Sequence, residues 1–213
     1  ENGQIKIPAF SLNDMQGDKI SNKSHEFAEQ VLLSRYLRGN DCVLELGANI
    51  GCSSIVINKL LKEPFNHVCL EPIPQIFKVL KKNLSANRAS CSALEGYIGD
   101  VPNLPFRPFG HNLTASRQVC LGSHSVVLPR CYTLEEAQSY VGKPFSVLFA
   151  DCEGCLPGVI ESFPALLEGL RLLIYESDIH GEMNKIDYEE MNYRLSSRGF
   201  KKLSSSNHRH AIW

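Results

Sequence analysis

A short apolar run followed by two glycines constrains the fold of this chain more than any other feature. Residues 42–46 form the run, Glu45 lies near its end, and Gly47 and Gly51 follow it. Glycine permits tight turns and a close backbone approach that a Cβ atom would block. Residues 53–61 then have the composition of a helix. This order predicts a buried strand, a tight turn and a helix, which together direct backbone N–H groups and the start of the helix toward a ligand.

The spacing of the glycines indicates which ligand to expect. They are spaced G-x-x-x-G and lack the third glycine of the dinucleotide fingerprint G-x-G-x-x-G. Glu71 closes the next apolar run, 20 residues after Gly51, where an acid can hold ribose hydroxyls. For Glu71 alone, a surface glutamate in an ordinary strand–helix–strand unit is an equal alternative. Together with Glu45, Gly47 and Gly51, it favours a nucleoside site of the kind found in methyltransferases that use S-adenosylmethionine.

Length and charge limit the other functional classes. A chain of 213 residues fits one domain with a complete core, so we treat residues 1–213 as a single domain. A net charge of −1 does not provide the strongly basic surface of a nucleic-acid-binding protein. No apolar run is long enough to span a bilayer and no signal peptide is visible, so we expect a cytoplasmic location and no membrane span.

The cysteines separate into two groups. Cys42, Cys52 and Cys69 lie in or beside expected strands, and we interpret them as small core residues in a reducing compartment. Cys152 and Cys155 have the C-x-x-C spacing of redox and zinc sites. Because no second C-x-x-C supplies further ligands, we expect neither chemistry at this pair.

Apolar runs and helical patterns alternate along the chain, which predicts an α/β fold with a mainly parallel sheet. The expected strands are 42–46, 67–71, 92–98, 145–150 and 170–175, and the expected helices are 26–37, 53–61, 74–86, 157–168 and 188–197. Residues 200–204 and 208–213 have no helix between them, so they should pair antiparallel. Five parallel strands and a C-terminal antiparallel hairpin are the layout of the class I methyltransferases, a Rossmann-like, doubly wound sheet.

Two segments lie outside this alternation. Residues 1–40 are expected to form an N-terminal helical cover. Residues 101–130 are rich in proline and glycine, with β-like runs at 117–121 and 125–128. A segment this long is unusual as a plain loop. We expect either a β-rich insertion that caps the acceptor site or a decorative hairpin.

Several short motifs, in this order, resemble the FkbM-type methyltransferases. Residues 45–51 look like the family's D-x-G-A-N-x-G loop, with Glu in place of Asp. Residues 71–74 and 80–83 are similar to its E-P-x-P and L-x-x-N segments. Residues 133–135 look like its T-L-D, and residues 151–154 resemble its D-x-E-G signature. The resemblance covers residues 26–176.

The resemblance implies an S-adenosylmethionine-dependent O-methyltransferase that acts on a sugar hydroxyl of a glycan or glycosylated metabolite. Two positions depart from the family pattern, because Phe149 replaces a lysine and Leu156 replaces an acid. Methylation of another small-molecule hydroxyl is therefore an alternative. Nucleic-acid methylation is a weaker one, because the N/D-P-P-Y/F motif is absent. The start at Glu1 fits either one domain of a larger glycan-processing enzyme or a processed chain.

The expected site lies where the strands end. The candidate cofactor-binding residues are Glu45, Gly47, Asn49, Gly51, Glu71, Pro72, Ile98, Asp100 and Asp151. Asp100 could meet the adenine amino group, although a turn-capping role is almost as well supported. The candidate catalytic residues are Asp151, Glu153, Glu176, Asp178 and His180. In a doubly wound sheet these positions surround the switch point where ligands bind.

The catalytic residues support two mechanisms. One is a metal-free general base, with Asp151, Glu176 or His180 as the candidates. The other is a divalent ion, Mg²⁺ or Mn²⁺, held by Asp151, Glu176 and Asp178, which would orient two hydroxyls and lower their pKa. Polar residues are common at strand ends in α/β proteins. Taken singly, Asp178 and His180 are therefore explained equally well as ordinary surface residues and as catalytic residues.

Overall fold

The structure is a computed structural model and describes residues 5–21, 25–99, 129–177, 188–206 and 210–213. The central strands are β3 (Val43–Leu46), β4 (His67–Glu71), β5 (Ser92–Ile98), β6 (Arg130–Tyr132), β7 (Val147–Ala150), β8 (Leu172–Glu176), β9 (Ser204–Ser206) and β10 (His210–Ile212). Within the described ranges they form one sheet in the order β6-β5-β4-β3-β7-β8-β10-β9. Strands β3 to β8 pair in parallel, and β10 pairs antiparallel with both β8 and β9.

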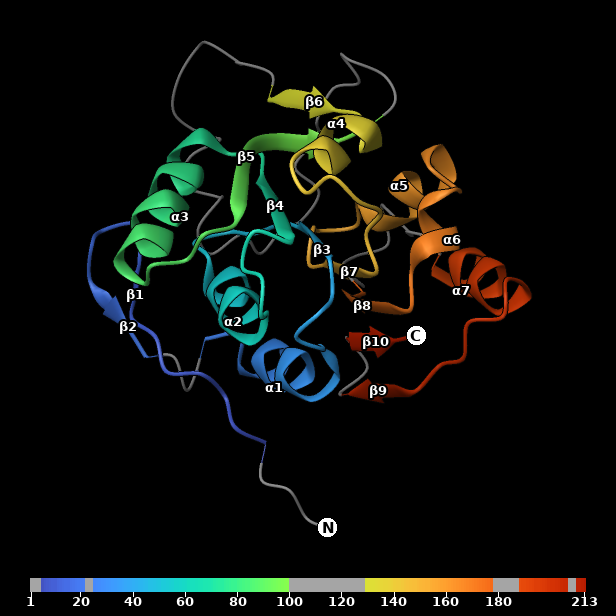
Figure 1. Ribbon diagram of the computed structural model, residues 1–213, viewed down its shortest axis with the longest axis horizontal. Helices are drawn as coiled ribbons and strands as arrows, with labels where there is room; N and C mark the ends of the chain where they lie inside the picture. The colour runs from blue at the N-terminus through green and yellow to red at the C-terminus, as the bar shows by residue number, and fades with distance from the viewer. Residues whose placement is uncertain (1–4, 22–24, 100–128, 178–187, 207–209) are drawn as a thin grey trace, which may run out of the picture.

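Helices cover both faces of this sheet (Figure 1). They are α1 (Phe27–Tyr36), α2 (Cys52–Leu60), α3 (Pro74–Ala86), α4 (Leu134–Ser139), α5 (Leu156–Ser162), α6 (Leu166–Gly169) and α7 (Tyr188–Ser197). Helices α1, α2 and α3 lie on one face, and α4 to α7 lie on the other. A separate pair of short strands, β1 (Leu12–Asn13) and β2 (Lys19–Ile20), packs near α3.

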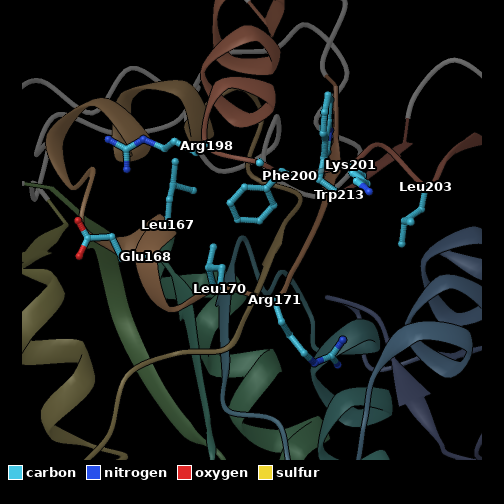
Figure 2. A pocket seen from close by; sticks show the side chains of 10 residues that line it. Leu167, Glu168, Leu170, Arg171, Arg198, Phe200, Lys201, Leu203 and Trp213 are labelled. Atoms are coloured by element: carbon cyan, nitrogen blue, oxygen red, sulfur yellow. The ribbon is translucent and has the colours of Figure 1, made fainter.

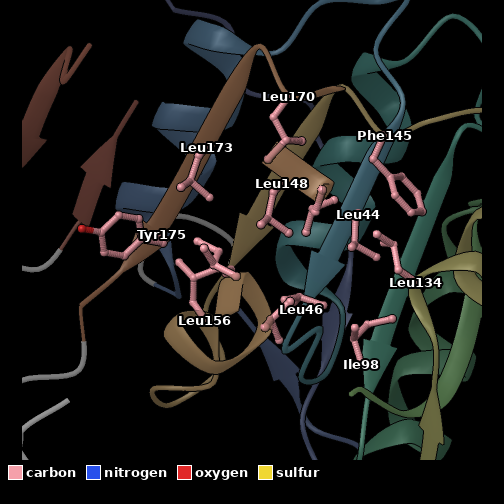
Figure 3. Packing of buried hydrophobic residues seen from close by; sticks show 14 of the residues in the cluster. Leu44, Leu46, Ile98, Leu134, Phe145, Leu148, Leu156, Leu170, Leu173 and Tyr175 are labelled. Carbon is pink, nitrogen blue, oxygen red and sulfur yellow. The ribbon is translucent and has the colours of Figure 1, made fainter. Parts of the chain in front are cut away.

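The sheet is buried on both sides because helices cover both faces. Every residue of β3 and β7 is buried, as expected for parallel strands between two helical layers. Leu44, Leu148 and Leu173 face the core beneath α4 to α7 (Figure 3). Val43 and Val147 face the opposite core, beneath α1 and α2.

The expected class I arrangement is confirmed: the five strands run parallel and the C-terminal hairpin is antiparallel. A sixth parallel strand, β6, was not expected. It pairs with β5 and leads into α4, whose first turn is closed by a capping box between Thr133 and Glu136.

Two parts of the fold differ from the expectation, and a third cannot be compared with it. The helix expected at 157–168 is divided into α5 and α6, because Phe163 leaves the helical conformation at the end of α5. The first forty residues contain the β1–β2 pair as well as a helix. The expected insertion at 101–130 lies outside the described residues, apart from its last two positions. None of the helices in the described ranges combines the length and apolar character needed to cross a bilayer.

Candidate functional site

The carboxyl ends of β3, β4, β7 and β8 meet at one edge of the sheet, here called the carboxyl edge. The turn after β3 lies at this edge and has three residues with positive φ: Gly47 (83°), Asn49 (47°) and Gly51 (98°). Asparagine tolerates this conformation better than most residues. The amides of Gly47 and Ala48 both donate to the carbonyl of Leu70, at 3.1 and 2.9 Å. The turn is therefore held firmly against the end of β4.

The two glycines are required by the protein's own packing. A Cβ atom on Gly47 would lie 1.8 Å from the carbonyl oxygen of Asp151, and one on Gly51 would lie 2.8 Å from Leu80 Cδ1. The first contact cannot be relieved by a side-chain movement, because its partner is backbone. The turn after β3 and the end of β7 consequently lie against each other, with Asp151 N donating to Leu46 O at 3.0 Å.

Glu71 lies at the end of β4 beside this turn. Its Oε2 accepts a hydrogen bond from Asn49 N at 3.0 Å, and its Oε1 accepts one from Ile73 N at 2.8 Å. Burial raises the pKa of Glu71 to about 7, against the opposing effect of these two backbone donors. Pro72 follows it and is half-buried. Glu71 therefore presents a desolvated carboxyl group with lone pairs still able to accept from a ligand.

Glu45 does not lie with these residues. Its side chain has no exposed surface, and its Oε2 is 2.9 Å from His67 Nε2. Glu45 alternates along β3 with Leu44 and Leu46, so it points to the face covered by α2 and away from the carboxyl edge. Of the two acids expected to bind the nucleoside, the structure brings only Glu71 to the turn.

The D-x-E-G segment follows β7 at the same edge. Glu153 and Gly154 both have positive φ, at 52° and 92°. Cys152 and Cys155 are joined by a disulfide. We did not expect this bond from the sequence, because a lone C-x-x-C offered no second ligand pair. Cys42, Cys52 and Cys69 are free and buried, as expected for core residues.

A group of three residues lies at the end of β8, and the sequence indicated only one of them, Glu176. Glu29 Oε1, from the first turn of α1, is 2.5 Å from Nε2 of His210, the first residue of β10. Glu176 is opposite His210 in the antiparallel register. Ligand atoms of Glu29, Glu176 and His210 all lie within 4.8 Å of one another. These three residues are called the edge cluster below.

One signal could have found His210. A strand that returns antiparallel beside 170–175 must pass the end of that strand, so its first residues lie next to Glu176. Glu29 carried no such signal, since it is separated from His210 by 181 positions.

The remaining expected site residues divide into two groups. Ile98 is buried at the end of β5, in the same core as Leu46. Asp100, Asp178 and His180 lie outside the described residues. The expected metal set therefore has two described members, Asp151 and Glu176, and the structure groups Glu176 with the edge cluster. The roles assigned to these residues stay predictions.

An open pocket of about 670 Å³ lies at the opposite, amino-terminal edge of the sheet (Figure 2). It is lined by Leu167, Glu168, Leu170, Arg171, Arg198, Gly199, Phe200, Lys201, Leu203 and Trp213. Two of its cations have partners within the protein: Arg171 pairs with Asp41, and Arg198 donates to Pro164 O. Ligands of doubly wound sheets bind at the carboxyl edge, so we place the functional site there despite the volume of this pocket.

Solved structures resemble the fold that this geometry defines. A precorrin-6Y C5,15-methyltransferase from Geobacter metallireducens GS-15 matches with a TM-score of 0.50 and 14% identity, over 89% of this chain and 88% of that one. A precorrin-8W decarboxylase from Methanobacterium thermoautotrophicum matches at 0.49 and 10%, over 87% of both chains. An O-methyltransferase from Bacillus cereus, in complex with SAH, matches at 0.48 and 15%, over 97% and 82%.

The chain therefore has the class I methyltransferase fold, a Rossmann-like sheet with an antiparallel C-terminal hairpin. No family model and no curated protein matches the sequence. The resemblance to the FkbM type accordingly stays a prediction that rests on the motifs alone.

Proposed function

We propose that this protein is an S-adenosylmethionine-dependent O-methyltransferase of the FkbM type that methylates a sugar hydroxyl. One observation carries the proposal: the Gly47–Gly51 turn and the Glu71 carboxyl group lie together at the ends of two adjacent parallel strands, β3 and β4, of a class I sheet. Glycine-rich turns and strand-end acids at this switch point are typical of nucleoside binding.

The residues present fit this cofactor. Glu71 has lone pairs for the two ribose hydroxyls, and a charge-assisted bond from a hydroxyl would offset the cost of ionising it in a buried position. Helix α2 begins directly after the turn, and its N-cap residue, Gly51, provides no side-chain hydrogen bond to the first turn. Its first amides are therefore directed toward the carboxyl edge. The cofactor supplies a methyl group that is already electrophilic on its sulfonium sulfur. Glu45 has no part in this proposal, because it is enclosed on the other side of β3.

The protein must position the acceptor and remove its proton. Orientation of the reacting groups can lower a barrier by several kcal/mol, and a positioned base adds about 10²–10⁴-fold. Asp151 and Glu153 lie beside the turn, and the edge cluster supplies a histidine hydrogen-bonded to a carboxylate. We assign Asp151 to the acceptor side and His210 as the described base, with Glu29 fixing its orientation. Asp178 and His180 remain candidates from the sequence.

A divalent ion is the alternative to a metal-free base. Glu29, Glu176 and His210 offer oxygen and imidazole ligands within 4.8 Å of one another, which suits Mg²⁺ or Mn²⁺ only in part, because these ions prefer oxygen. If the metal acts, chelation with EDTA abolishes turnover and Mg²⁺ or Mn²⁺ restores it. Full activity in EDTA would exclude this route.

The carbohydrate acceptor is supported by the FkbM-like motifs alone. Another small-molecule hydroxyl is the second candidate. A cytoplasmic location and a place within a larger glycan-processing enzyme belong to the same proposal. The cap proposed for residues 101–130 can be tested by deleting its tip, which should raise the acceptor KM and leave cofactor affinity unchanged.

Two measurements test the proposal. Calorimetry should show S-adenosylhomocysteine binding more tightly than NAD, and Glu71→Ala should weaken it by about 1–3 kcal/mol. Incubation with S-adenosylmethionine and a panel of glycans, read by mass, should give a cofactor-dependent methyl addition. The matched control for binding is Glu168→Ala, at the opposite edge. In the turnover assay, Asp151→Asn should lose most of its kcat while still binding the cofactor. Equal nucleoside binding by wild type and Glu71→Ala would overturn the cofactor assignment.

A further inference from the structure

A second group of chemically reactive side chains lies inside the molecule, on the face of the sheet beneath α2 and α3. Its members are Glu45, His67, Cys69 and Cys91, here called the buried Cys–His cluster. Glu45 is opposite Cys69 in the β3–β4 register, and His67 is two residues before Cys69 on the same face of β4. Cys91 directly precedes β5, whose first residue is opposite Val68.

Two distances within this cluster are close to those between ligands of one tetrahedral metal ion. Ligand atoms of Glu45, His67 and Cys69 all lie within 4.8 Å of one another. The Sγ atoms of Cys69 and Cys91 are 3.9 Å apart, and two thiolates on one tetrahedral zinc lie about 3.8 Å apart. Glu45 Oε2 and His67 Nε2 are 2.9 Å apart, whereas oxygen and nitrogen ligands of one zinc lie about 3.3 Å apart. Glu45 and His67 would therefore have to separate by a few tenths of an ångström, and Cys91 would have to turn toward them, for one ion to contact all four side chains.

Some buried polar atoms of the cluster also lack good hydrogen bonds within the described part of the protein. Glu45, His67 and Cys69 have no exposed surface. Glu45 Oε1 and His67 Nδ1 are buried and make no hydrogen bond of good geometry in the described part of the chain, although Ser54 lies near Glu45 and Cys91 lies near His67. Most buried polar groups in native proteins are paired, and an unpaired one calls for an explanation such as a bound ion. Two such atoms in adjacent side chains are hard to explain by packing.

The donor set selects the metal. Two thiols, an imidazole and a carboxylate form a soft to borderline ligand set, which zinc prefers and magnesium does not. The thiolate is the form that binds metal.

We propose that the buried Cys–His cluster binds one structural zinc ion that ties β3, β4 and β5 together. All four ligands come from the protein, and three of them are fully enclosed, as in zinc sites that serve folding and not catalysis. Cys91 is partly exposed and provides the entry path. The ion would balance the charge of the Glu45 carboxylate, which is fully enclosed beside His67. This inference does not depend on the methyltransferase proposal.

The first experiment measures metal content. Inductively coupled plasma mass spectrometry should find about one zinc ion per chain in untagged protein that was purified without chelators. Cys91→Ser changes the most accessible ligand and should lower the zinc content at least tenfold, roughly the loss expected for a weakened metal site. Cys42→Ser is the matched control: it alters another buried free cysteine, outside the cluster, and should retain the zinc. A wild-type chain without zinc, or one with iron or copper in its place, would overturn the assignment.

The second experiment needs no variant, so it stays informative if Cys91→Ser fails to fold. Wild-type protein is stripped of zinc with a chelator and refilled with Co²⁺. Thiolate-to-cobalt charge-transfer absorption, together with the visible bands of tetrahedral cobalt, should appear at one equivalent. The Tm should fall on stripping and return with Zn²⁺ but not with Mg²⁺. A Tm that is unchanged by stripping, or cobalt spectra of octahedral aqua ions, would overturn the proposal.

Discussion

The edge cluster and the buried Cys–His cluster are both built around a glutamate hydrogen-bonded to a histidine, yet their surroundings differ. The Glu45–His67 pair has no exposed surface and is accompanied by two thiols. The Glu29–His210 pair retains a little exposure and is accompanied by the carboxylate of Glu176. The same two residue types therefore lie in a fully enclosed environment with thiols in one region and in an almost fully buried, acidic environment at the strand ends in the other.

The pKa values of the two glutamates respond in opposite directions. Burial raises the pKa of Glu45, and His67 does not overcome this effect. Burial also raises the pKa of Glu29, but the hydrogen bond and charge of His210 outweigh it, so the net pKa is lowered. A carboxylate that stays ionised beside a histidine favours proton exchange, whereas an enclosed one depends on its neighbours for charge balance. We therefore expect the enclosed pair to stabilise the fold and the pair at the sheet edge to take part in the proposed chemistry.

The largest effect should come from His67→Ala. Removing one partner of a fully buried pair should lower the free energy of unfolding by about 3–5 kcal/mol. His210→Ala should cost less, about 1–2 kcal/mol, because Glu29 can be rehydrated at the edge. Urea unfolding followed by circular dichroism measures both. Equal losses in the two variants would break the comparison.

The next effect concerns turnover at the edge cluster. His210→Gln should lower kcat by about 10²-fold or more, because the amide cannot accept a proton from the acceptor. Its affinity for S-adenosylhomocysteine should be unchanged, since the turn and Glu71 are left intact. Glu29→Gln should show a smaller loss, as expected for a residue that positions the base. If His210→Gln retains normal kcat, the edge cluster has no part in proton removal.

A third buried acid, Glu71, sharpens the comparison because no histidine accompanies it. Its pKa of about 7 means that the carboxylate forms as the pH rises through neutrality. Ribose hydroxyls donate to the ionised form, so nucleoside affinity should fall by up to about tenfold as the pH drops from 7 to 6. Calorimetry at several pH values measures this, and Glu71→Gln should lose the dependence. A wild-type affinity that stays constant from pH 6 to 8 would contradict the role of this carboxylate.

The smallest effect should come from the pocket at the amino-terminal edge. Arg198→Ala should change the free energy of unfolding by no more than about 0.5 kcal/mol, because its contact is at the surface. Neither kcat nor nucleoside affinity should change. A marked loss of activity would show that a third region contributes to function and that neither cluster is sufficient.

The sequence predicted those parts of the fold that depend on neighbouring residues. The apolar runs at 67–71 and 92–98 and the proline at the start of 74–86 coincide with β4, β5 and α3. The turn with Gly47 and Gly51 was predicted for the same reason, since positive φ at these positions has a local cause.

Features that depend on distant pairing could not be predicted in this way. Glu45 lies in a strand whose every residue is buried, so alternation does not reveal which side of the sheet it faces. Its contact with His67, and that of Cys69 with Cys91, follow from the register of separate strands. The pairing of Glu29 with His210 joins the first helix to the last strand. Only the assembled sheet brings these residues together.

The contact between Gly47 and Asp151 has a consequence for anyone who wishes to change the acceptor of this protein. The loops after β3 and β7 are in direct contact, and the contact has no room for one added carbon. A Cβ on Gly47 would lie 1.8 Å from Asp151 O. Libraries that vary position 47, or insert residues between 150 and 152, would therefore contain mostly misfolded clones. Glu153 is a better position to vary, because it is partly exposed and is not part of this contact.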